Sequence, residues 1–159
     1  IIRDVQAVHV DQGYQKVLGF VKHSSYDCVP VVDADGYYIG YIGYHHIRNF
    51  AYDPSFGQLI IAADLMVTGR ELNLDKDTPE QMAEKFADSH TSYLPAVHAA
   101  EQNESRLALV GLIDHQTLMR YLLAHSAAEQ ARQEEEAAPA VQAESKSTEK
   151  KDESTDSDQ

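Results

Sequence analysis

Histidine, cysteine and aspartate are the side chains here whose chemistry depends most on spacing. The chain has eight histidines and one cysteine. His45 and His46 are adjacent, so on a helix they point about 100° apart and do not form the i, i+4 pair that suits zinc. Asp33 and Asp35 flank a turn but lack the loop pattern of a calcium site. These spacings predict no metal site.

The common catalytic patterns are also absent from the sequence. It contains no Gly-x-Ser-x-Gly, P-loop, Cys-x-x-Cys or paired catalytic carboxylates. Cys28 lies in an apolar run, which favours a small buried side chain over a reactive thiol. We therefore expect a chain that is not an enzyme.

The chain repeats itself, with Pro30 and Pro95 aligned at an offset of 65 residues. Each copy has a helix-period apolar pattern, a polar turn and a short apolar strand that carries the proline. A second strand containing a glycine follows, and then another amphipathic run. A duplication of this length predicts two half-domains that bury each other's apolar faces, with a cleft between them for a ligand.

The spacing predicts the elements of the first copy, in which Asp11 caps the first helix and Asp33–Gly36 form a hairpin turn. They are a strand over 5–10, a helix over 12–23, strands over 28–32 and 37–43, and a helix over 44–51.

The second copy begins with a helical turn over 63–66. Thr78, Pro79 and Gln81 mark the start of its main helix as a capping box. The remaining expected elements are strands over 71–74, 93–97 and 107–113, a polar loop over 98–106, and a helix over 115–125 that continues into the Ala/Glu/Gln stretch.

Composition limits the partners. The formal net charge is −13, and the region 127–159 holds 10 acidic and 4 basic residues but no Leu, Ile or aromatic residue. That region is predicted to be a disordered acidic tail. An acidic chain disfavours nucleic acid as a partner, and the sequence has no apolar run long enough to span a bilayer.

The repeated pieces resemble a tandem pair of cystathionine-β-synthase (CBS) domains, the Bateman module. They are Cys28-Val-Pro-Val-Val-Asp33 with Gly40-Tyr-Ile-Gly43, and Tyr93-Leu-Pro-Ala-Val97 with Val110-Gly-Leu-Ile113. The resemblance implies an α/β (α+β) fold in which each repeat is a small three-stranded sheet with helices on one side, packed as a pseudo-two-fold pair. The expected parts are a first repeat (1–54), a linker (55–62), a second repeat (63–125) and a tail (126–159).

The segment Tyr52–Met66 is similar to the segment that joins the CBS repeats of bacterial ClC-family chloride channels and chloride/proton antiporters. This resemblance implies a regulatory domain at the cytoplasmic face of the cell membrane, as part of a longer membrane protein. It also implies an attached transport domain and a second copy of the chain as partners, with the start at Ile1 marking an excised fragment.

The family's nucleotide motif, Gly-x-(Ile/Val)-(Ser/Thr)-x-x-Asp, implies an adenosine nucleotide (ATP, ADP or AMP) as the ligand. This chain departs from it: Gly43 and Asp114 stand at the hydroxyl position, and His46 and Thr117 stand at the ribose Asp position. Tyr26 is a candidate to stack on the base. The candidate cleft residues are Tyr26, Val29, Pro30, Gly43, His46, Leu94, Pro95, Asp114 and Thr117.

Two further interpretations remain open. The chain could be a nucleotide-sensing CBS pair attached to an enzyme or to another transporter. It could instead be a structural dimerisation module with an empty cleft, which the missing ribose Asp in both repeats favours.

Overall fold

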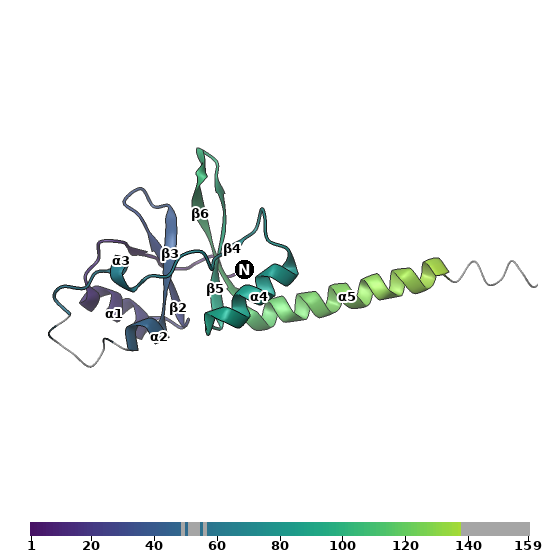
Figure 1. Cartoon of the computed structure of the whole chain (residues 1–159), viewed down its shortest axis with the longest axis horizontal. Helices are drawn as coiled ribbons and strands as arrows, with labels where there is room; N and C mark the ends of the chain where they lie inside the picture. The colour runs from purple at the N-terminus through teal and green to yellow at the C-terminus, as the bar shows by residue number, and fades with distance from the viewer. Residues whose placement is uncertain (49, 51–54, 56, 138–159) are drawn as a thin grey trace, which may run out of the picture. The chain divides into compact units, whose positions relative to one another are not determined.

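A computed structural model describes residues 1–48, 50, 55 and 57–137 (Figure 1). The chain divides into two units, Ile1–Leu122 and Leu123–Gln159. Among the described residues, none of the helices combines the length and the apolar character that a membrane span requires. The predicted disorder of the tail concerns residues that lie largely outside those described, and so does the end of the helix predicted over 44–51.

The elements alternate as the duplication predicts. In chain order they are β1 (Val8–His9), α1 (Tyr14–His23), β2 (Cys28–Val32), β3 (Tyr38–Gly43), α2 (Tyr44–Arg48), α3 (Ala62–Leu65), β4 (Leu72–Asn73), α4 (Pro79–Ser89), β5 (Tyr93–Ala100), β6 (Asn103–Asp114) and α5 (His115–Ala137).

The six strands form one sheet in the order β1-β2-β3-β6-β5-β4. The two halves match, because β1 and β4 run parallel to β2 and β5, which in turn pair antiparallel with β3 and β6. The halves join through the single pair Tyr38–Leu107 between β3 and β6. This arrangement confirms the predicted mixed fold and extends it, since the two three-stranded sheets are continuous.

Beyond that pair, each repeat lends a short extended segment to the sheet of the other. Ile2 exchanges two backbone hydrogen bonds with Leu112 of β6, at 2.8 and 2.9 Å. Val67 does the same with Tyr41 of β3, at 2.8 and 3.0 Å. The strands β3 and β6 therefore have their backbone groups paired across the boundary between repeats.

A glycine permits each of these approaches. A Cβ at Gly111, whose φ is 155°, would lie 2.0 Å from the carbonyl oxygen of Ile2, and a Cβ at Gly40 would lie 2.8 Å from that of Val67. The glycine of each repeated Gly-x-Ile pattern is thus explained by the neighbouring backbone.

Local sequence explains the start of α4 but not that of α1. The Thr78 side chain accepts from the Gln81 N–H, and the Gln81 side chain accepts from the Thr78 N–H, as predicted. The prediction that Asp11 caps α1 is wrong. Gly13 is the N-cap without a side-chain bond, because the carbonyl of Ile60 accepts from the first helical N–H, that of Tyr14.

The prediction of a loop over 98–106 is also wrong. Strands β5 and β6 extend through it as a long hairpin whose last pair is Ala100 with Asn103. Backbone pairing holds these residues although Asn103, Glu104 and Ser105 are exposed and show no apolar alternation. The turn predicted at Asp33 is confirmed, since the Asp33 carboxylate accepts from the N–H groups of Asp35 and Tyr37.

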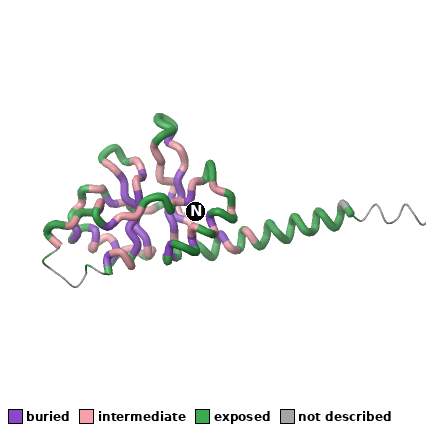
Figure 2. Tube along the Cα trace, viewed as in Figure 1, coloured by how far each residue is buried: buried purple, intermediate pink, exposed green. Residues whose placement is uncertain are grey.

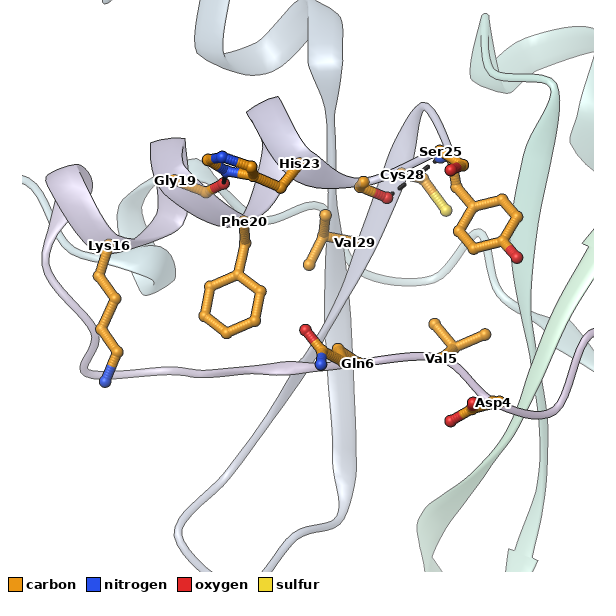
Figure 3. Close-up of a pocket in the computed structure, with 12 residues that line it drawn as sticks. Asp4, Val5, Gln6, Lys16, Gly19, Phe20, His23, Ser25, Cys28 and Val29 are labelled. Carbon is orange, nitrogen blue, oxygen red and sulfur yellow. Dashed lines mark hydrogen bonds between the residues drawn. The ribbon is translucent and has the colours of Figure 1, made fainter.

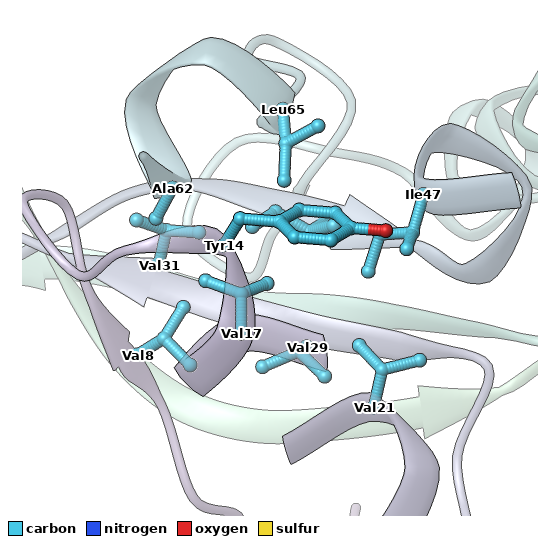
Figure 4. Packing of buried hydrophobic residues seen from close by; sticks show 10 residues of the cluster. Val8, Tyr14, Val17, Val21, Val29, Val31, Ile47, Ala62 and Leu65 are labelled. Atoms are coloured by element: carbon cyan, nitrogen blue, oxygen red, sulfur yellow. The ribbon is translucent and has the colours of Figure 1, made fainter. Parts of the chain in front are cut away.

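Each repeat has its own buried core, with exposed residues gathered in the turns and on the outer helix faces (Figure 2). In the first core the Tyr14 ring lies among valines of α1 and β2, with Leu65 of α3 and Ile47 of α2 against it (Figure 4). The second core holds Phe86 and Met82 of α4, and also Cys28 and Tyr41 from the first repeat. The two repeats therefore share apolar surface.

Candidate ligand pocket

A pocket of about 640 Å³ lies between α1 and the segment that precedes β1 (Figure 3). It falls within the range of small-molecule sites, about 300–1,000 Å³. Helix α1 presents Lys16, Phe20 and His23 to it, at i, i+4 and i+7, because Tyr14, Val17 and Val21 turn the opposite side into the core. The other lining residues are Asp4, Val5, Gln6, Gly19, Ser24, Ser25, Tyr26, Cys28 and Val29.

The lining separates into an apolar part and a charged rim. Phe20, Tyr26 and Val29 supply aromatic and aliphatic surface, which suits a planar ring. The ammonium of Lys16 can bind an anionic group, and the amide of Gln6 can donate to and accept from a polar heterocycle. Cys28 contributes only packing, since burial raises the pKa of its thiol far above the ordinary value.

The pocket adjoins the boundary between the repeats. Val5 and Tyr26 pack against the second core, and the Tyr26 ring meets the Tyr93 ring edge-on with centroids 5.0 Å apart. Tyr93 lines a second, smaller hollow of about 360 Å³ together with Asp114. A ligand on Tyr26 would therefore touch a side chain that packs against both repeats.

The predicted cleft residues do not gather in one place. Tyr26 and Val29 line the pocket, whereas Asp114 lines the smaller hollow. Thr117 donates to the Asp114 carboxylate from the first turn of α5. The remaining members are internal to the sheet or to the first repeat: Pro30, Leu94 and Pro95 are buried, and Gly43 bonds His46.

The backbone N–H of Gly43 and the side chain of His46 are hydrogen-bonded to each other. The Gly43 N–H donates to His46 Nδ1 at 2.9 Å, and a Cβ at Gly43 would lie 2.7 Å from Cε1 of His45. A serine or threonine at position 43 would require that ring to move. Although His45 and His46 are adjacent in the sequence, their rings lie close together, with centroids 4.0 Å apart. The ring centroid of His90 lies 6.4 Å from that of His45.

This packing controls the protonation of His46. Burial, then the neighbouring His45 and then Arg70 lower the pKa of His46 to about 4. Burial and His90 likewise lower the pKa of His45, although Asp27 opposes them. Neutral His46 is the form that can accept from Gly43, because a protonated ring has no free nitrogen lone pair.

Acidification is therefore expected to weaken the fold through His46. Its folded pKa of about 4 lies below its ordinary value, so the unfolded chain binds more protons between about pH 6.5 and 4. The free energy of unfolding should fall as the pH drops through that range. The loss is on the order of 1 kcal/mol, because partial solvent exposure screens the ring.

Urea unfolding at pH 7 and pH 5 measures this effect. His46→Asn keeps an acceptor for Gly43 and should reduce the loss of stability between these two pH values. His9→Gln, at an exposed histidine on β1, is the control and should retain the loss. An undiminished loss in His46→Asn would show that other groups cause it.

Comparison with known proteins places the fold. A family model for the CBS domain matches residues 1–53. The chain superposes on an uncharacterized conserved protein from Pyrococcus horikoshii with a TM-score of 0.57 at 22% identity, over 76% of this chain and 50% of that one. It thus spans half the length of that protein. The fold is that of a CBS-domain pair.

Two structures with the same fold carry adenosine ligands. CBSX2 in complex with AMP matches with a TM-score of 0.57 at 15% identity, over 77% of this chain and 90% of that one. CbpB from Listeria monocytogenes, in complex with c-di-AMP, matches with a TM-score of 0.56 at 14% identity over the same shares. No curated protein sequence matches the chain.

The pocket residues that the sequence did not indicate are those of α1 and of the segment before β1. The stripe of Lys16, Phe20 and His23 lies away from Tyr14, Val17 and Val21 on the same helix, but in the sequence it reads as an ordinary outer face. Within the described part of the chain, no three His, Cys, Asp or Glu residues are grouped so as to hold a metal ion.

Proposed function

We propose that this CBS pair is a non-catalytic regulatory domain that binds an adenosine mononucleotide in the α1 pocket. The pocket carries the proposal: it combines Phe20 and Tyr26 for the base with Lys16 for a phosphate. The AMP of CBSX2 supports this class of ligand, and the c-di-AMP of CbpB is a cyclic dinucleotide that carries the same base. Tyr26 packs on Tyr93, so binding would bias the packing of one repeat on the other.

AMP is expected to raise the melting temperature of the chain. A ligand at a hundredfold excess over its Kd adds about 2.7 kcal/mol, which corresponds to several degrees for a domain of this size. Thermal unfolding with AMP, ADP, ATP and adenosine measures the shift. An unmoved melting temperature with all four would refute the proposal and favour a dimerisation module with an empty cleft.

Substitution of Lys16 tests whether this side chain binds the phosphate of AMP. Lys16→Met should reduce the shift with AMP and leave the smaller shift with adenosine unchanged, because adenosine has no phosphate. Lys22→Met removes an exposed lysine of the same helix that does not line the pocket, and should behave as the parent. Equal responses of the two variants to AMP would place the phosphate elsewhere.

The attachment of this domain is a second proposal, supported by the similarity of Tyr52–Met66 to ClC linkers. Part of that segment lies outside the described residues. The regulated partner would be a ClC-type chloride transport domain at the cytoplasmic face of the membrane, in an assembly with a second copy of the chain. The coding sequence upstream of Ile1 tests this, since several hydrophobic helices support transport and a catalytic domain supports an enzyme.

A further inference from the structure

The pseudo-two-fold relation gives the pocket a counterpart in the second repeat. Helix α4 corresponds to α1, with Lys85 at the position of Phe20. The segment from Val67 to β4 corresponds to the segment from Ile2 to β1, because Val67 and Ile2 make equivalent exchanges with β3 and β6. The same gap between helix and segment can therefore be compared in both repeats.

In the second repeat, charged side chains cross this gap. The ammonium of Lys85 donates to the carbonyl oxygen of Glu71 in the segment at 2.8 Å. It also donates to the carboxylate of Asp77, between β4 and α4, at 2.5 Å. The guanidinium of Arg70 donates to the carbonyl oxygen of Asp88 at the end of α4. Helix and segment are thus tied together from both sides.

The ion pair between Lys85 and Asp77 is partly buried. The Lys85 side chain is 28% exposed and that of Asp77 is 14% exposed, so the pair is more shielded than a surface ion pair. A ligand entering there would have to displace this pair and leave its charges without partners, which costs free energy. In the first repeat, Phe20 and Val5 offer no such bonds, and the gap is the pocket.

We propose that the chain binds one nucleotide and not two, because Lys85 and Arg70 close the counterpart of the α1 pocket. This inference rests on the proposed function and adds its stoichiometry and location. Repeat duplication alone would give two equivalent sites, and the charged residues of the second repeat remove one of them.

Isothermal titration of the full chain with AMP tests the stoichiometry. The expected result is one AMP per chain. Phe20→Glu, which replaces the ring expected against the base with a charged side chain, should lose detectable binding while thermal unfolding shows that the variant is folded. The double variant Lys85→Met/Arg70→Met should keep the α1 site, with a Kd within about twofold of the parent, since neither residue touches it.

The outcomes separate the two proposals. Absence of AMP binding to the parent rejects the proposed function itself. Two AMP per chain in the parent overturns the single-site inference alone. Binding that survives Phe20→Glu and is lost in the double variant overturns both proposals, because it places the nucleotide in the counterpart of the α1 pocket. A second, weaker site that arises only in the double variant supports it, because it shows that the two cations close the counterpart.

Discussion

Gly111→Ala is expected to destabilise the chain severely, by on the order of 3 kcal/mol or more. The added Cβ would lie 2.0 Å from the carbonyl oxygen of Ile2, and the backbone φ of 155° is one that alanine rarely adopts. Relief of the clash must move Ile2 away and break both of its hydrogen bonds to Leu112. The donor and acceptor of Leu112 would then lose their partners in the sheet.

Urea unfolding of three variants measures the effect. Gly40→Ala, with its Cβ 2.8 Å from the carbonyl oxygen of Val67, should be destabilised less, because its backbone φ is not in the positive range. Gly19→Ala in α1 meets no neighbour and should equal or exceed the parent by up to about 1 kcal/mol. A Gly111→Ala variant within 1 kcal/mol of the parent would show that the Ile2 exchange contributes little.

Asp27→Ala should cost about 2 kcal/mol, because one carboxylate holds the start of β5 to the first repeat. Its two oxygens accept from the N–H groups of Ser92 and Tyr93, at 2.6 and 3.2 Å. Bonds from backbone N–H groups to a charged carboxylate are among the stronger ones in proteins. Removal of the side chain leaves two N–H groups of the second repeat without this acceptor.

Asp35→Ala is the matched control, since it also removes a carboxylate that spans the repeats. Asp35 accepts from Arg106 at 2.8 Å, but its side chain is 67% exposed, so its loss should cost no more than about 0.5 kcal/mol. Chemical denaturation at neutral pH compares the two. An equal or larger cost for Asp35→Ala would place the connection at the Arg106 surface instead.

The sequence predicted those elements whose signals are local. Asp33 marked a hairpin turn and Thr78 marked a helix start through residues within four positions of each. Pro30 and Pro95 marked equivalent strands because the pattern around each one repeats. The exchange of Ile2 and Val67 left no comparable signal. It consists of one backbone pair at each place, formed over a separation of more than a hundred residues for Ile2 and of 26 for Val67.

The site was harder to predict than the fold because the nucleotide motif predicts a site at the ends of β3 and β6. There, His46 bonds Gly43 and Thr117 bonds Asp114, so both motif positions are occupied by contacts within the chain. The pocket is built from α1 instead, where Lys16 and Phe20 read as ordinary outer-face residues. The space between these side chains and the segment before β1 is visible only in the folded structure.

The exchange of Ile2 and Val67 resembles a small domain swap within one chain, because each repeat supplies one backbone pair to a strand of the other. A single repeat produced alone would have a sheet edge with unpaired backbone donors and acceptors, at Tyr41 in one case and at Leu112 in the other. Such edges recruit other chains. We therefore expect half of this protein to associate with copies of itself, and the pair of repeats to be the smallest piece in which these backbone groups are paired.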